Sequence, residues 1–403
     1  MSEPSRNDLT PAKRCDFIDQ LRGWAVIVMI EVHAVNVWLL KDLLPSWLSF
    51  VNGLVAPAFI MCAGFSLVLS TFRPDGTLRP FAPGMKRLGF ILLCAYLLHA
   101  PPVTMPGWMR LITPKQVYEW FQIDVLQCIV FSLLILHGVA RIIRRPMAFA
   151  GAALALALAV TLAAPYLWQL GVAQGWWPPV RGLINGNMDG GVSSLFPLFP
   201  WFAFAACGCV LGTLYRHFRV IAPTGMARWS ESRWLVALAI LGVALFLWGR
   251  QYASVWLENG VFPAGETERI YNTTLPSVAR RLGAVLMAGA VMGWLEIFRN
   301  RWHGPNWVLI ASRESLLLYM LHLNLIFGLL LAPQVLTLTG WKPQSMGWQG
   351  SLTLTLALII VNLAAGLAWQ RIRKMDNLDR RIRHFALGAL AVWIVAAACL
   401  TPR

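Results

Sequence analysis

The chain has 403 residues, of which 58% are hydrophobic and only 13% are charged, and its mean hydropathy is +0.60. Water-soluble globular proteins carry about 25% charged residues, so a cytosolic enzyme, a DNA-binding protein and a disordered chain are excluded. The net charge of +16 is typical of membrane proteins, because their cytoplasmic loops are rich in Lys and Arg and face anionic lipid. The lipid bilayer is therefore an expected partner, and nucleic acid is not.

Apolar runs long enough to cross a bilayer follow one another along the chain, because a membrane-spanning helix needs about 20 such residues. They predict an all-α, polytopic bundle of about eleven transmembrane helices. We divide the chain into a cytoplasmic N-terminal segment (1–22), a transmembrane core (23–332) and C-terminal transmembrane helices (333–403). The expected spans are 23–41, 48–71, 88–104, 122–140, 147–170, 195–215, 233–249, 281–298, 307–332, 350–370 and 384–400.

The positions of the basic residues predict how the bundle lies across the membrane. If the N-terminus is cytoplasmic, 24 of the 34 Lys and Arg residues fall in inner segments, as the positive-inside rule requires. We therefore expect the N-terminus inside and the C-terminus outside. The polar, basic start of the chain does not resemble a cleavable signal, and these features favour a bacterial inner (plasma) membrane.

The cysteines do not indicate a metal or disulfide site. Six of the seven lie within apolar runs, and no Cys-x-x-Cys pair occurs. Structural zinc sites and disulfide frameworks need paired, regularly spaced cysteines. The sequence therefore predicts no metal cofactor.

The first span carries the densest set of ionisable residues. Arg22 and His33 are 11 residues apart, which places them on one helix face and roughly 16 Å apart along the axis. Arg22 is expected at the inner interface and His33 near the midplane, with Asp19 one turn before Arg22. A lone histidine in a helix is usually a satisfied core residue. This one is aligned with an interfacial Arg–Asp pair inside a membrane span, which favours a functional role.

The ninth span carries a second polar stripe. Ser315, Tyr319 and His322 follow i, i+4, i+7 spacing and share one face. Such side chains hydrogen-bond between membrane helices or contact a substrate, and both interpretations stay open. Arg313, at the inner end, falls on the other face of a straight helix.

The predicted outer side offers weaker candidates. His99 lies near the end of the third span, and Asp124 and Gln127 begin the fourth, where they are expected to line an external vestibule. Loops 171–194 and 250–279 are rich in Trp and Asn. Interfacial tryptophans are mostly belt residues, while a minority of them would stack on a sugar.

These motifs together resemble the transmembrane acyltransferase superfamily. The first span opens like its Asp-x-x-Arg-Gly/Ala-x-Ala element, in DQLRGWAVIVMIEVHAVN, and Arg22 and His33 match the Arg-x10-His pattern of the family-three membrane O-acyltransferases. The second span resembles Phe-x-x-x-x-Gly-Phe/Val-Ser, in APAFIMCAGFSLVLS. Later elements of the heparan-α-glucosaminide N-acetyltransferase branch are similar to QIDVLQCIVFSLLIL, FPLFPWFAFAACGCVLGTLY and SRESLLLYMLH.

The chain departs from these patterns in two places. The last element usually reads Gly-Arg-Asn/Thr-Ser-Leu, whereas this chain has Ser312-Arg313-Glu314-Ser315-Leu316. The catalytic histidine of the heparan enzyme lies further along, where this chain has no histidine between Val37 and Lys41. His33 therefore corresponds to the family-three pattern only.

The resemblance implies transfer of an acyl group, most often acetyl, from cytoplasmic acyl-CoA to a sugar or glycan outside the membrane. His33 would be the general base or would carry the acyl group itself. His322, Tyr319 or Ser315 would orient the acceptor or stabilise the oxyanion, and Asp19 would orient Arg22. The CoA phosphates would be held by Arg22, Arg73, Lys86, Arg87 and Arg313, although the positive-inside rule also accounts for most of these.

Two other functions are compatible with the composition. A secondary transporter or proton-coupled exporter would use the buried His, Glu and Arg residues as a proton relay, but no internal repeat relates the two halves. A non-catalytic scaffold would leave the alignment of Asp19, Arg22 and His33 without a reason. The partners expected for the acyltransferase are acyl-CoA and an extracytoplasmic saccharide acceptor, and a homodimer stays open.

Overall fold

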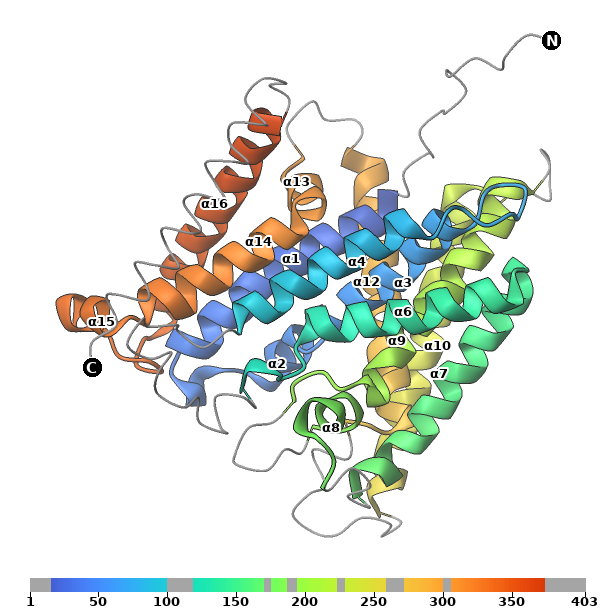
Figure 1. Ribbon diagram of the computed structural model, residues 1–403. Coiled ribbons are helices and arrows are strands. Elements are labelled where there is room, and N and C mark those ends of the chain that lie inside the picture. The colour runs from blue at the N-terminus through green and yellow to red at the C-terminus, as the bar shows by residue number, and fades with distance from the viewer. Residues whose placement is uncertain are drawn as a thin grey trace.

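A computed structural model describes residues 16–99, 119–169, 175–186, 194–222, 229–258, 272–299 and 306–373. Within these ranges the regular structure is helical, and the helices pack into one bundle (Figure 1). Eight of the described helices are long and apolar enough to cross a membrane. A ninth candidate is broken: α13 (Trp307–Arg313) and α14 (Ser315–Leu323), which continues into η5 (Asn324–Leu330), meet at an angle of 87°. The chain is therefore an all-helical, polytopic membrane protein.

The expected number of eleven spans is matched only in part. The third expected span corresponds to α4 (Ala82–Leu98), which has 17 residues and is shorter than the ~20 that a full crossing needs. Pro83 occupies the first turn of α4, where proline suits a helix start, so the helix begins earlier than predicted. The eleventh span, 384–400, lies outside the described residues. The orientation of both termini stays a prediction.

Helix α1 (Asp16–Trp38) contacts helices from both ends of the sequence. Its partners include α3 (Val55–Thr71), α12 (Leu275–Arg299), α13, α14 and α16 (Trp348–Arg373). It begins seven residues before the predicted span. A Cβ at Gly23 would lie 2.0 Å from the Val308 carbonyl oxygen, so only glycine permits this approach of α13.

The remainder of the bundle is organised around α9 (Leu198–Tyr215), which packs on α3, on α6 (Val125–Ile143) and on α7 (Pro146–Gln169). The backbones of α3 and α9 approach closely, since a Cβ at Gly208 would lie 2.1 Å from the Met61 carbonyl oxygen. Small residues at such contacts are typical of membrane helix pairs. This packing leaves the large side chains Phe65 and Phe204 fully buried beside it.

The remaining elements surround this core. Helix α10 (Glu231–Glu258) packs along α12, and α16 lies against α1, α13 and α14 at the other edge of the bundle. Both present exposed apolar side chains such as Ile240 and Ile360, as lipid-facing helices do. The other described elements are η1 (Lys41–Leu43), α2 (Ser46–Asn52), α8 (Pro178–Ile184), η4 (Arg216–Ile221) and α15 (Pro333–Thr339).

Candidate active site

Two histidines from distant parts of the chain meet inside the bundle. His33 lies on α1 and His322 lies on α14, and their ring centroids are 5.2 Å apart. His322 is fully buried, whereas His33 is half-buried. The ring of Phe327, in η5, stands edge-on to His33 with the centroids 5.8 Å apart. The structure thus joins the candidate stripe of the first span to that of the ninth.

The protonation pattern of His322 follows from its hydrogen bond. Nδ1 lies 2.8 Å from the Leu318 carbonyl oxygen, and since a carbonyl only accepts, Nδ1 carries the proton and donates. In the neutral ring Nε2 then holds the lone pair. This atom is buried and has no hydrogen-bond partner among the described residues. An available imidazole lone pair is what a general base or a nucleophile requires.

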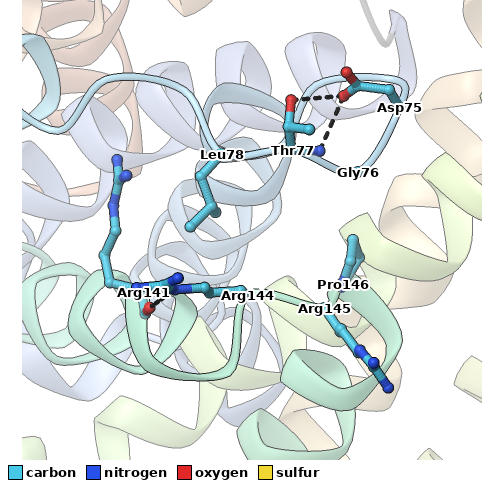
Figure 2. A pocket seen from close by; sticks show the side chains of 8 residues that line it. All are labelled: Asp75, Gly76, Thr77, Leu78, Arg141, Arg144, Arg145 and Pro146. Carbon is cyan, nitrogen blue, oxygen red and sulfur yellow. Dashed lines mark hydrogen bonds between the residues drawn. The ribbon is translucent and has the colours of Figure 1, made fainter.

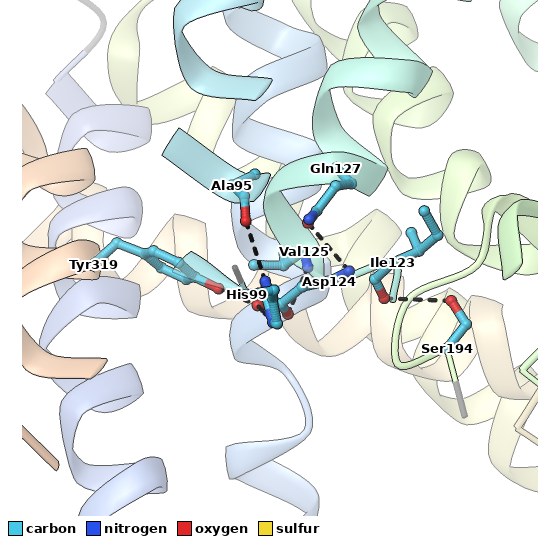
Figure 3. Close-up of polar contacts among 8 residues, drawn as sticks. All are labelled: Ala95, His99, Ile123, Asp124, Val125, Gln127, Ser194 and Tyr319. Atoms are coloured by element: carbon cyan, nitrogen blue, oxygen red, sulfur yellow. Dashed lines mark hydrogen bonds and ion pairs between the residues drawn. The ribbon is translucent and has the colours of Figure 1, made fainter. Parts of the chain in front are cut away.

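A carboxylate, Asp124, lies between Tyr319 and a third histidine, His99 (Figure 3). The Tyr319 hydroxyl donates to Oδ2 of Asp124 across 2.5 Å, and Nε2 of His99 lies 3.8 Å from the same oxygen. The Tyr319 ring also stands edge-on to His322, with the centroids 5.6 Å apart. Polar contacts therefore run from His99 through Asp124 to the Tyr319 hydroxyl, and ring contacts continue from Tyr319 to the two facing imidazoles.

Local sequence fixes the position of Asp124. It is the N-cap of α6: its side chain accepts from the Val125 N–H at 2.7 Å, while Oε1 of Gln127 accepts from the Asp124 N–H at 3.2 Å. This reciprocal arrangement is a capping box. Both residues are buried rather than exposed in an outer vestibule. The Asp-x-x-Gln spacing was a usable signal for the cap, but nothing local indicated that Tyr319 would be the partner.

The other end of α1 carries a separate polar cluster. The expected Asp19–Arg22 pair is present, with Oδ1 and Nη2 2.6 Å apart, and Nε of Arg22 donates to the Ser312 hydroxyl at 3.0 Å. This cluster is about 16 Å along the helix from His33, so Asp19 does not reach the histidines. At the adjoining α13–α14 break, the buried Glu314 forms an ion pair with Arg373 of α16.

The remaining residues expected to bind a cofactor are exposed. Arg73 lies in the hairpin turn before α4, Lys86 and Arg87 lie in the first turns of α4, and Arg313 ends α13. The 87° break changes the position expected for Arg313, because α13 and α14 are not one straight helix. Phosphate binding by these four residues stays a prediction.

Comparison with known proteins identifies the family. Residues 14–251 match the family described as heparan-alpha-glucosaminide N-acetyltransferase, catalytic. The chain belongs to this family. No individual curated protein matches the chain. The matched region includes His33, His99 and Asp124, whereas Tyr319 and His322 follow it in the sequence. Family membership and the long apolar helices together make the chain an integral membrane member of an acetyltransferase family.

Proposed function

We propose that this protein transfers an acyl group, by our reading acetyl, from cytoplasmic acyl-CoA to a saccharide on the outer side of a bacterial inner membrane. The observation that carries the proposal is the pair of His33 and His322, whose rings face each other inside the helical bundle of a member of this family. Family membership supports acetyl transfer in general. The donor, the acceptor and the direction are what the resemblance to the transmembrane acyltransferases implies, and the basic residues of the predicted inner face are compatible with them.

In the proposed reaction His33 is the general base. Its lone pair accepts the proton of an acceptor hydroxyl or amine as that atom attacks the thioester carbonyl. The tetrahedral oxyanion then collapses, the carbon–sulfur bond breaks, and the leaving thiolate takes the proton back from the imidazolium. A base placed in this way contributes about 10²- to 10⁴-fold to the rate. A two-step route through an acyl-histidine uses the same residue as nucleophile.

The surrounding residues support this step by positioning. Tyr319 commits its only hydroxyl proton to Asp124, which favours an orienting role over direct stabilisation of the oxyanion. Its ring borders His322, and the Leu318 carbonyl selects the His322 tautomer. His322 is thus held with Nε2 available beside His33, ready to hydrogen-bond the acceptor or the protonated base.

Donor binding is assigned to the opposite end of α1. Arg22 is held by Asp19 and Ser312 and keeps charge-assisted donors for a phosphate. The roughly 16 Å between Arg22 and His33 is a span that an extended pantetheine arm can bridge. Arg73, Lys86, Arg87 and Arg313 are proposed to contribute to the same electropositive side.

The direct test is ligand-dependent thermal unfolding of the purified protein in detergent. A ligand present at a hundredfold excess over its Kd stabilises the native state by about 2.7 kcal/mol. We expect acetyl-CoA to raise the Tm of the wild type, and Arg22→Ala to reduce that shift. Arg371→Ala, which removes an exposed arginine of α16, is the matched control and should keep it.

A secondary transporter is the alternative function, and the bent α13–α14 segment is the feature that favours it. Broken helices line substrate sites in many transporters. If no acyl-CoA shifts the Tm, donor binding is contradicted. Solute flux in proteoliposomes would then be the assay of choice.

A further inference from the structure

A pocket unrelated to the histidine pair lies at the predicted cytoplasmic end of α6. It has a volume of about 680 Å³ and separates the hairpin turn before α4 from the short turn that joins α6 to α7 (Figure 2). Arg141 on α6 is 17 residues from Asp124, about 26 Å along the helix. The residues that line the pocket are Asp75, Gly76, Thr77, Leu78, Arg141, Arg144, Arg145 and Pro146.

Two arginines of this pocket, Arg141 and Arg144, are held in place by contacts that do not neutralise their charge. Arg141 extends toward the hairpin (Figure 2). It donates to the Arg79 carbonyl and lies over the Phe81 ring at 5.4 Å. Its Nε–H is buried without an acceptor among the described residues. Arg144, in the left-handed region at φ 60°, uses Nε to reach the Arg141 carbonyl at 3.3 Å. None of these contacts is with a carboxylate.

The one acid in the pocket is engaged within its own turn. Asp75 accepts from the Thr77 N–H at 2.9 Å and from the Thr77 hydroxyl at 2.8 Å. These two hydrogen bonds hold the pKa of Asp75 below its ordinary value, with the backbone bond the larger cause. Of the three arginines that line the pocket, Arg141 extends toward the hairpin that carries this internally bonded carboxylate. Helix α7 begins at Pro146 on the same rim, and a helix N-terminus adds further preference for an anion.

We propose that this pocket binds a phosphate group. Arginine pairs with phosphate through several charge-assisted hydrogen bonds at once, and Arg141 and Arg144 bond only backbone carbonyl oxygens within the described residues. The proposal stands apart from acyl transfer, because no residue of the pocket belongs to the histidine site.

Two carriers could bring that phosphate. An anionic phospholipid headgroup would enter from the bilayer, where Phe81, Ile142 and Met147 leave apolar side chains exposed near the rim. A soluble phosphorylated nucleotide would enter from the aqueous side through the open mouth of the pocket. The chemistry of recognition is the same, so the two sources are distinguished by the probe.

The experiment compares wild type, Arg144→Gln and Arg145→Gln. The matched control is Arg371→Gln, which removes the same charge from an exposed position on α16. The lipid arm measures by native mass spectrometry how much phosphatidylglycerol is retained relative to phosphatidylcholine. The soluble arm measures equilibrium binding of adenosine 3′,5′-bisphosphate, the nucleotide portion of coenzyme A, to protein in neutral detergent. Arg22→Ala is measured beside it, so that binding at the proposed donor end is recognised. Unchanged Tm values for all variants would show that they are folded.

We expect Arg144→Gln to weaken binding of the productive probe about tenfold, as loss of one charge-assisted pair does. Arg145→Gln should have a smaller effect, because Arg145 extends away from the hairpin (Figure 2). Loss in the lipid arm identifies a headgroup site, and loss in the soluble arm identifies a nucleotide site. Equal binding of wild type and both variants in both arms would overturn the proposal. His33→Ala should leave phosphate binding unchanged, which separates this result from failure of the proposed acyl transfer.

Discussion

At the scale of single residues, the two facing imidazoles are the proposed catalytic centre. A neutral imidazole is tolerated inside a membrane bundle more readily than a lysine or a carboxylate, because it carries no charge at neutral pH. The two histidines have different surroundings. His322 is held by a hydrogen bond to the Leu318 carbonyl, whereas His33 is half-buried beside Phe327. This asymmetry is the basis for assigning the reacting role to His33.

The first prediction concerns His33→Ala. Transfer of labelled acetyl from acetyl-CoA should fall by at least about 10²-fold, the usual contribution of a general base. The yield and Tm of the protein should stay near wild type, because the side chain is only half-buried. His217→Ala, at an exposed histidine, is the matched control. Full transfer activity in the His33 variant would remove this residue from the mechanism.

The second prediction concerns the bond between Tyr319 and Asp124. Tyr319→Phe leaves a buried carboxylate without this donor and should destabilise the protein by about 1–3 kcal/mol. Asp124→Asn retains a residue that caps a helix well but changes the charge of the acceptor. If the two side chains act together, the double variant should cost less than the sum of the single variants.

A double-mutant cycle of unfolding free energies measures this coupling directly. The control cycle combines Asp124→Asn with Thr353→Val, which changes an exposed threonine of α16. The changes in unfolding free energy of these two variants should be additive. Additive costs for Tyr319→Phe and Asp124→Asn would show that the contact at 2.5 Å does not contribute to stability.

At the scale of elements, the contact between α1 and α13 determines which side chains surround Arg22. Gly23 allows the two backbones to approach, and this approach brings Ser312 within 3.0 Å of Arg22. The same segment breaks at Glu314, where the ion pair with Arg373 ties α16 to the bend. Packing around one glycine and one buried acid thus sets the geometry of the proposed donor end.

The third prediction compares two glycines. Gly23→Ala places a methyl group 2.0 Å from the Val308 carbonyl oxygen and must push α13 away, so it should lower both the Tm and the acetyl-CoA-dependent shift. Gly89→Ala, on α4, meets no atom within 4 Å. It should be neutral or stabilising by up to about 1 kcal/mol through helix propensity. Equal Tm values for the two variants would contradict the close-packing argument.

At the scale of the whole molecule, the basic clusters and the histidine pair lie at different depths along the bundle. The Arg22 cluster, the α13–α14 break and the pocket proposed to bind phosphate belong to the end where the sequence predicts cytoplasm. The His33–His322 pair lies deeper, toward the predicted outer side. This separation is what an enzyme needs if donor and acceptor arrive from opposite sides of a membrane.

The fourth prediction tests that orientation. In a variant without native cysteines, Lys86→Cys at the start of α4 and Lys342→Cys in the segment before α16 are both exposed positions. An impermeant thiol reagent applied to intact cells should label Lys342→Cys at once. It should label Lys86→Cys only after the membrane is permeabilised. The reverse pattern would invert the predicted topology.

Features that depend on neighbouring residues could be predicted from the sequence. The apolar runs gave the positions of most long helices, because burying a helical backbone in lipid requires about 20 apolar residues in succession. The Asp19–Arg22 pair also followed from i, i+3 spacing, since residues three apart share a helix face. Likewise, His33 could be singled out because an ionisable group within an apolar run is costly.

The tertiary structure decided the contacts that no local pattern encodes. His33 and His322 are 289 residues apart in the sequence, and only the packing of α1 against α14 brings them together. The break at Glu314 was also invisible, since hydropathy reports how apolar a run is and not whether it bends. The hydrogen bond between Asp124 and Tyr319 likewise depends on helix packing, because the two residues are far apart in the sequence. The sequence by itself determined which polar and ionisable side chains fall within apolar spans, where burial is unfavourable. The tertiary structure determined which of these side chains contact one another, because helices distant in sequence pack together.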